Sequence, residues 1–188
     1  MFRRKPRSNR WKGFVLGSLG GVAGVLAMQY YWQLATWLHG GQDPRKMKAT
    51  NNSTQALDSI SLVGQQHEEG ESSTAAMGRI AYRALTGKEP RSQETRTMLS
   101  YLVHWIISMS VAGMYGALRG RTTVPDAEGG AAMGTTLWLL GDELAMPLLG
   151  LTEGPAAYSP LLHVHSFGAH VAYGVASSLA TQVLHRLT

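Results

Sequence analysis

Four long apolar blocks constrain the fold of this chain more than any other feature. Each block is near or above the roughly 20 residues that an α-helix needs to cross a bilayer. The first two contain no Asp, Glu, Lys or Arg, whereas a helix of a water-soluble bundle carries a polar stripe along its outer side. We therefore predict an all-α integral membrane bundle of four transmembrane helices, at residues 13–38, 97–118, 129–151 and 160–186.

The polar parts of the chain are its N-terminus, residues 1–12, and a long first loop, residues 39–96. Within this loop, residues 74–86 place apolar side chains at helical spacing, with Arg79 and Arg83 on the other side. This pattern predicts a short amphipathic helix that lies on the membrane surface or against a partner.

The distribution of charge predicts the topology. The formal net charge is +5, and it is carried largely by residues 1–12. A basic segment before an apolar run also fits a secretory signal, but the run continues to Leu38, which is too long for one. We expect both termini in the cytoplasm, because Arg119, Arg121 and Arg186 then lie on the inner side. The basic residues of the first loop would lie outside, against this rule.

Composition excludes two classes of site. The chain has no cysteine, so neither disulfides nor thiolate metal ligands can form. The basic residues gather at one end rather than in a groove with interleaved aromatic side chains. We therefore expect no binding of nucleic acid.

The first block carries glycines three and four residues apart. Such rows of small residues let a second helix backbone approach closely. We predict a helix-packing face rather than a ligand site, formed by Gly13, Gly17, Gly20, Gly21 and Gly24.

Asp142 and Glu143 lie near the middle of the third block, where carboxyl groups are costly in lipid. At a rise of about 1.5 Å per residue, polar groups on all four helices fall at a similar depth in the outer half of the membrane. We expect one of the two carboxyls to contact His170, with His104 extending that contact. The predicted polar layer comprises Gln29, His104, Asp142, Glu143, His165 and His170.

The polar layer admits three interpretations. The first is structural, with His and carboxyl side chains holding the helices together. The second is a proton or ion pathway, because a buried carboxylate beside a histidine can share a proton. The third is a metal or haem site, since imidazole and carboxylate suit zinc, iron or manganese. The possible metal ligands are His104, Glu143, His163 and His170.

The local spacing of the histidines gives no catalytic motif. His163 lies seven residues before His170 and shares its helix face, whereas His165 points largely elsewhere. This is not the Glu-x-x-His spacing of di-iron bundles. No GxSxG elbow, HExxH pair or phosphate-binding glycine loop accompanies these residues. We predict no catalytic residue and no required cofactor.

Four short motifs carry a family resemblance. They read MYGAL at residues 114–118, LWLLGDE at 137–143, MPLLGL at 146–151 and HVAYG at 170–174. In these motifs the chain resembles the YagU-like family of bacterial inner-membrane proteins, a family of unknown function. The resemblance implies a glycine-rich first helix, a long first connection and a location in the bacterial inner membrane. It implies no reaction, cofactor or ligand.

Together these patterns predict a non-enzymatic, multi-pass membrane protein in the lipid bilayer. We expect it to pack through its small-residue faces, either with itself or as an accessory subunit of a larger assembly. One alternative is a proton-coupled or ion-conducting transporter that uses Asp142, Glu143 and His170. The other is a metal- or haem-binding redox subunit that uses His104, His163 and His170.

Overall fold

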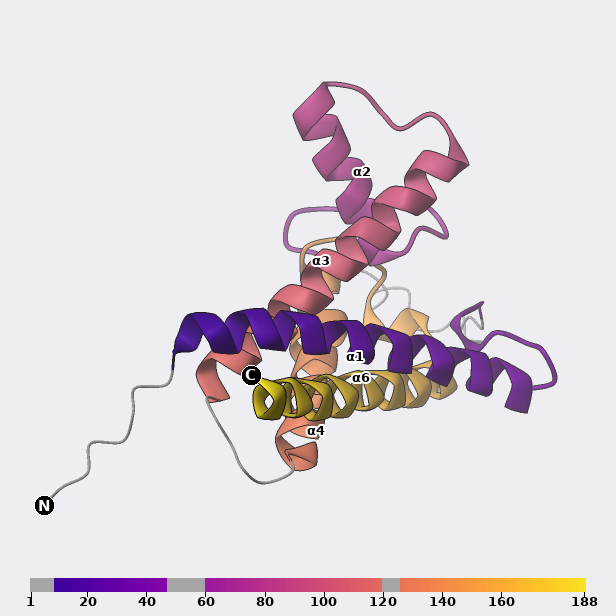
Figure 1. The fold of residues 1–188 in the computed structure, drawn as a ribbon. Helices are drawn as coiled ribbons and strands as arrows, with labels where there is room; N and C mark the ends of the chain where they lie inside the picture. The colour runs from indigo at the N-terminus through magenta and orange to yellow at the C-terminus, as the bar shows by residue number, and fades with distance from the viewer. Residues whose placement is uncertain (1–8, 47–59, 120–125) are drawn as a thin grey trace, which may run out of the picture.

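The structure is a computed structural model that describes residues 9–46, 60–119 and 126–188. All regular structure in these three stretches is helical, with no β-strand, so the predicted all-α class is confirmed there. Three long helices, one shorter helix and a helical run with a changed winding make up the fold (Figure 1). The elements are α1 (Arg10–Leu38), η1 (Pro44–Lys46), α2 (Ser73–Thr86), α3 (Gln93–Arg119), α4 (Ala127–Thr136), η2 (Leu137–Ala145), α5 (Met146–Leu148), η3 (Pro155–Ala157) and α6 (Pro160–Leu187).

Local hydrogen bonds fix several helix ends. The side chains of Asn9, Ser72 and Ser159 accept hydrogen bonds from backbone N–H groups in the first turns of α1, α2 and α6. Gly87, with φ of 70°, ends α2 in the left-handed region that favours glycine. The predicted amphipathic segment is therefore a defined helix, and it packs on α3, where Gly78 contacts the backbone of Leu99.

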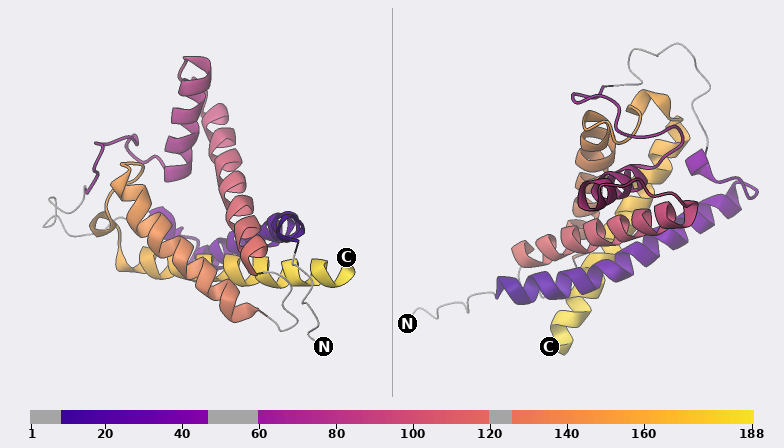
Figure 2. Two further views of the ribbon diagram at one scale, coloured as in Figure 1. Left: turned by 90° about the vertical axis from the view of Figure 1, so that its left-hand side faces the viewer. Right: turned by 90° about the horizontal axis from the view of Figure 1, so that it is seen from above.

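Helix α1 lies between two partners. One of its faces packs against α3 and another against α6, while α4 packs on α6 and α2 folds back on α3. These helices cross one another rather than lying side by side over their full lengths (Figure 2). The arrangement is thus a set of crossed pairs that share α1 and α6.

The glycines of α1 divide between its two partners. Gly13, Gly17 and Gly21 lie against the backbone of α3, and Gly20 and Gly24 lie against α6. A Cβ added at Gly21 would sit 3.2 Å from the Cα of Met109. The packing face expected from the sequence is therefore two faces, and both are occupied within the chain.

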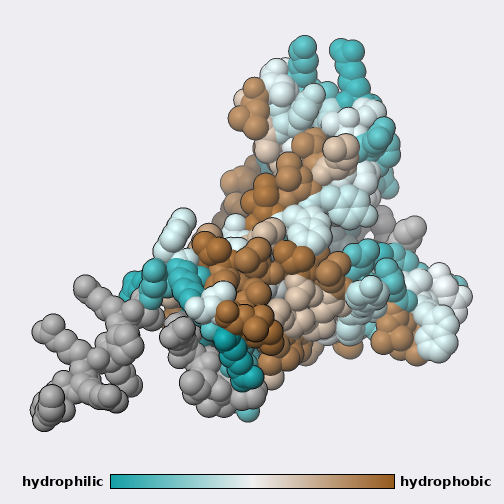
Figure 3. Space-filling view, in the orientation of Figure 1, coloured by the Kyte–Doolittle hydropathy of each residue, from teal (hydrophilic) through white to brown (hydrophobic). Residues whose placement is uncertain are grey.

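Many large apolar side chains point outward, and small residues lie at several of the helix contacts. Ala112, Ala169 and Ser177 are buried at the helix contacts. Leucines on each of the four predicted spans are about half exposed: Leu19 (50%), Leu102 (56%), Leu140 (54%) and Leu179 (37%). Hydrophobic residues accordingly cover much of the surface over α1 and α3 (Figure 3). Contiguous apolar surface of this kind is typical of membrane or protein contacts, and small residues at the contacts are typical of membrane helices.

Two of the described helices, α1 and α3, are long and apolar enough to cross a membrane. The same length and composition also occur in the core helix of a soluble protein or in a signal sequence. The third block is one continuous helical run, in which the π-helical segment η2 lies between the α-helical segments α4 and α5. Helix α6 follows it. Four spans therefore remain a prediction.

The described part of the first loop is tied to the end of the third block. The N–H of Leu62 donates to the carbonyl oxygen of Leu148 at 2.9 Å, and the N–H of Gln66 donates to that of Gly150 at 2.8 Å. The φ of Gly150 is 67°, so this turn also depends on a glycine. The loop is thereby held against residues more than 80 positions away in the sequence.

Arg79 on α2 holds the same loop from the other side. Its guanidinium lies 2.8 Å from the Glu71 carboxylate and donates to the carbonyl oxygen of Gln66 at 2.6 Å. Burial alone would raise the pKa of Glu71. Hydrogen bonds from Arg79 and from the N–H of Glu68, with the charge of Arg79, outweigh burial and lower that pKa.

This lowered pKa predicts how the loop responds to acid. Ionised Glu71 stabilises the folded loop fully above the ordinary glutamate pKa of about 4.3. That contribution is lost as the pH falls below this value through the folded pKa. Hydrogen exchange at Gln66 and His67, corrected for intrinsic rates, should then accelerate, and in Glu71→Gln it should be fast at every pH. Protection of the wild type that persists unchanged to pH 3 would contradict this prediction.

The glycine contacts predict a second effect, on stability. In Gly24→Ala the new methyl group would lie 2.6 Å from the Tyr173 ring and 2.7 Å from its carbonyl oxygen. We expect a loss of about 1–3 kcal/mol in the free energy of unfolding, measured in mild detergent. The matched control is Gly141→Ala, whose methyl group would have only an ordinary contact, at 3.5 Å to Leu137. Equal stability of the two variants would show that α1 and α6 do not need this close approach.

Candidate functional site

Two carboxyl–imidazole pairs join the π-helical segment η2 to α6. The Oε1 atom of Glu143 lies 2.7 Å from Nδ1 of His163. The Oδ2 atom of Asp142 lies 3.4 Å from Nε2 of His170. The contact expected for His170 is therefore made by Asp142, and Glu143 turns instead to His163.

The winding of η2 explains why two consecutive carboxyls reach one helix. Hydrogen bonds from i to i+5 put more residues in each turn, so neighbouring side chains diverge less than the about 100° of an α-helix. Pro147 follows directly; a proline ring clashes with the carbonyl group four residues earlier, here that of Glu143, and a wider turn relieves this clash. On the partner helix, His163 and His170 are seven residues apart and share a face.

A close helix contact places the pairs. Gly134 lies against the backbone of His170, with its ideal Cβ position 3.1 Å from the Cα of Val171. One turn away along both helices, Gly130 and Gly174 also meet backbone to backbone. The third block can therefore approach α6 closely enough for the short Asp and His side chains to meet.

The protonation of His170 follows from its neighbours. Its Nδ1 atom is 2.8 Å from the carbonyl oxygen of Ser166. A carbonyl oxygen only accepts, so Nδ1 must carry the hydrogen. In a neutral ring Nε2 is then an acceptor that faces Asp142, and an ionised carboxylate there would be repelled. The pair can accordingly hold one further proton, carried by Asp142 or by His170.

His163 also has one ring nitrogen at a carbonyl oxygen and the other at a carboxyl, but the roles of Nδ1 and Nε2 are exchanged. Its Nε2 atom is 2.9 Å from the carbonyl oxygen of Pro155 and must donate to it. Nδ1 then faces Glu143, and a hydrogen bond between them needs a proton on either Nδ1 or the Glu143 carboxyl. A pair that holds one shared proton has no net charge, which lowers the cost of placing it among apolar helices.

The two pairs differ in their access to the surroundings. The side chains of Glu143 and His163 are 17% and 26% exposed, and that of His170 is 11% exposed. Asp142 is 45% exposed and also forms a side-chain hydrogen bond with Ser166. Asp142 is thus the most exposed of the four groups.

The other residues of the predicted polar layer lie elsewhere. Nδ1 of His165 forms a hydrogen bond with the Tyr31 hydroxyl, 3.3 Å away. The centroid of the His165 ring is 4.9 Å from that of His39. His104 and Gln29 line a cleft between α1 and α3. The single layer expected from depth is therefore divided into groups, although His104 is close enough to His170 for the two rings to interact electrostatically. His39 had not been predicted, because it lies past the end of the first apolar block.

The possible metal ligands are divided in the same way. Glu143 and His163 form one pair, His170 belongs to the other, and His104 lies in the cleft. In the stretches 9–46, 60–119 and 126–188, no three His, Asp or Glu side chains are grouped as a metal site requires. The four residues named from the sequence do not form one ligand set.

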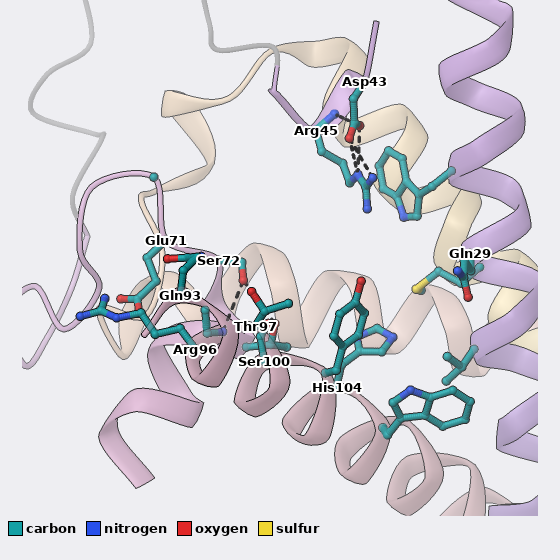
Figure 4. Close-up of a pocket in the computed structure, with 18 of the residues that line it drawn as sticks. Gln29, Asp43, Arg45, Glu71, Ser72, Gln93, Arg96, Thr97, Ser100 and His104 are labelled. Atoms are coloured by element: carbon teal, nitrogen blue, oxygen red, sulfur yellow. Dashed lines mark hydrogen bonds and ion pairs between the residues drawn. The ribbon is translucent and has the colours of Figure 1, made fainter. Parts of the chain in front are cut away.

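A cleft of about 1040 Å³ separates the C-terminal half of α1 from the N-terminal half of α3. Figure 4 shows Gln29 and His104 facing it from the two helices, with Asp43 and Arg45 at one side and Glu71 and Arg96 at another. The loop and the start of α2 close part of its rim.

An acidic junction near the start of α4 was also missed. Asp126 is 5% exposed and accepts a hydrogen bond from Nε of Arg119 at 2.6 Å and another from the Tyr115 hydroxyl. Its carbonyl oxygen accepts from the Ser178 hydroxyl at 2.9 Å. The sequence signal was an Asp directly before a helix and close to a basic connection, but it names neither partner. This junction ties α3, α4 and α6 together.

No protein-family model, curated protein or solved structure matches this chain. The resemblance to the YagU-like family therefore stays a prediction from short motifs.

The proton assignment predicts that variants of the Glu143–His163 pair lose unequal amounts of unfolding free energy. In Glu143→Leu or His163→Leu one polar partner is left without its neighbour, and we expect a loss of about 1–3 kcal/mol in unfolding free energy. The double variant should cost less than the sum of the two, by about 1–2 kcal/mol. Glu143→Gln should stay within about 1 kcal/mol of wild type, because its amide can donate to Nδ1. Additive losses measured by thermal unfolding in detergent would contradict the pairing.

Proposed function

We propose that this chain is an integral membrane protein that binds and releases protons at the two carboxyl–imidazole pairs, as part of proton-coupled transport. The observation that carries the proposal is the locked orientation of His163 and His170. Each ring has one nitrogen bonded to a carbonyl oxygen and the other facing a carboxyl oxygen. Each pair therefore binds one proton beyond what its parts would hold as carboxylate and neutral ring.

The membrane setting is supported by the distribution of side-chain size. Small residues occupy the helix contacts, and leucines of all four blocks face outward. We propose four spans in the bacterial inner membrane with both termini in the cytoplasm. In that setting the charge on a pair changes when a proton leaves or joins it, which is costly in lipid. Proton binding would therefore bias the contact between η2 and α6.

The accessory-subunit hypothesis has less support. It depended on glycine faces of α1 that could receive another protein, and α3 and α6 occupy these faces. The metal-binding hypothesis depended on a ligand set that is divided between separate groups. Family membership with the YagU-like proteins would be compatible with the proposal and adds no ligand to it.

Proton flux tests the proposal. Protein reconstituted into liposomes with a trapped pH-sensitive dye should collapse an imposed pH gradient. Glu143→Gln keeps the shape of the side chain but cannot release a proton, so we expect the flux to fall by about tenfold or more. Glu153→Gln, outside both pairs, is the matched control and should behave as wild type. Equal flux through the wild type, Glu143→Gln and Asp142→Asn would rule out this use of the pairs.

A further inference from the structure

We propose that the cleft between α1 and α3 binds an organic cation with a bulky apolar body. Its role as the species exchanged for protons rests on the proposed function, whereas binding itself can be measured separately. The inference draws on the shape of the cleft, on the order of its lining residues and on its charge.

The shape follows from where the two helices touch. They are antiparallel, and they meet backbone to backbone where Gly13 lies against Gly116 and Gly21 lies against Met109. Beyond Gly21 the side chains are large, and Met28 and Trp105 hold the helices apart. The cleft is therefore narrow at the glycine contacts and widens toward the first loop.

The lining changes from apolar to charged along the cleft. At the narrow end lie Val25 and Met28, which are buried, with the ring of Trp105 beside them. Neutral polar groups follow, including Gln29 and His104. The mouth carries charged residues of the loop and of the start of α3. Such a gradient fits an amphiphile whose apolar part enters first and whose charge stays near the mouth.

The charge at the mouth favours a cation. Arg45 is already paired with Asp43 at 2.8 Å, and Arg96 with Glu68 at 2.6 Å. These guanidinium groups are neutralised and offer little to a phosphate or carboxylate. Four carboxylates stand there against these two groups and the guanidinium of Arg79, which pairs with Glu71 at 2.8 Å, so one negative charge is in excess. Glu69 has no ion pair or hydrogen bond with any residue that the structure describes. The carboxylates are Asp43, Glu68, Glu69 and Glu71.

Aromatic rings supply the remaining recognition. The guanidinium of Arg45 lies over the ring of Trp32 at 5.3 Å from its centroid, so one cleft ring already receives a cation in this way. Trp105 and Tyr101 offer further faces in the same cleft. An ammonium or phosphonium centre flanked by apolar groups could contact these faces without losing a tightly held water shell.

Two probes of equal shape and opposite charge test the inference. Tetraphenylphosphonium and tetraphenylborate would be dialysed against the full chain in nanodiscs of phosphatidylcholine, and saturable binding above empty nanodiscs would be measured. We expect saturable binding of the phosphonium cation alone. Absence of saturable binding, or equal binding of the two ions, would overturn the proposal.

Matched variants locate the site. Trp105→Leu should weaken phosphonium binding about fivefold or more. Trp37→Leu, on α1 but outside the cleft and 73% exposed, should leave it unchanged. Glu69→Gln should weaken binding about twofold, and Glu153→Gln should not. If Trp105→Leu does not fold, the comparison of Glu69→Gln with Glu153→Gln decides, and wild-type binding by Glu69→Gln overturns the site.

The cleft and the proton pairs can fail independently. Glu143→Gln should bind the phosphonium cation as the wild type does while losing proton flux. Normal flux in Glu143→Gln and Asp142→Asn with intact binding would reject the proton-coupled function and leave the cation site standing. Lost flux without saturable binding by the wild type would reject the cation site alone.

Discussion

Close approach of helix backbones at glycine is the constraint on which this structure depends. In lipid, apolar side chains gain nothing by leaving the solvent, so helices associate through packing and polar contacts. Helix α1 uses different glycines for α3 and for α6, and Gly130 and Gly134 do the same between the third block and α6. The chain can thus keep its leucines outside and still form a dense interior.

The same constraint shapes both candidate sites. Where glycines bring the third block onto α6, short side chains can meet, and Asp142 pairs with His170. Where glycines end, beyond Gly21 on α1, larger side chains separate the helices and a cleft opens. One site therefore lies at a close contact and the other lies where close contact stops.

The sequence predicted those features that depend on neighbouring residues. Block length and apolarity predicted helices, and the helical spacing of apolar side chains in residues 74–86 predicted α2. It predicted packing glycines but not their partners, because which faces meet is decided by the whole fold. The common depth of the polar residues assumed straight, parallel α-helices. Crossed helices and the winding of η2 break that assumption, so His165 lies away from the pairs, and His104 lines the cleft while staying within electrostatic reach of His170.

For some features the sequence holds too little signal to name the partners. The attachment of residues 62–67 to Leu148 and Gly150 runs mainly through backbone hydrogen bonds, whose donors and acceptors nearly every residue carries. Asp126 and Arg119 are seven residues apart, and their contact depends on how the intervening chain turns. Glu143 was expected to compete for His170, and only the direction of its side chain shows that it faces His163.

Segment η2 gives the third helix a property that a uniform α-helix lacks. The nine residues of η2 make fewer turns than they would in an α-helix. If they changed to α-helical hydrogen bonds, the segment would lengthen, and the helix before Pro147 would rotate about its axis. Asp142 and Glu143 sit inside this coil, so a small change of pitch would carry both acids past their imidazoles together. The winding of the third helix thus changes in the segment that carries both acids, Asp142 and Glu143.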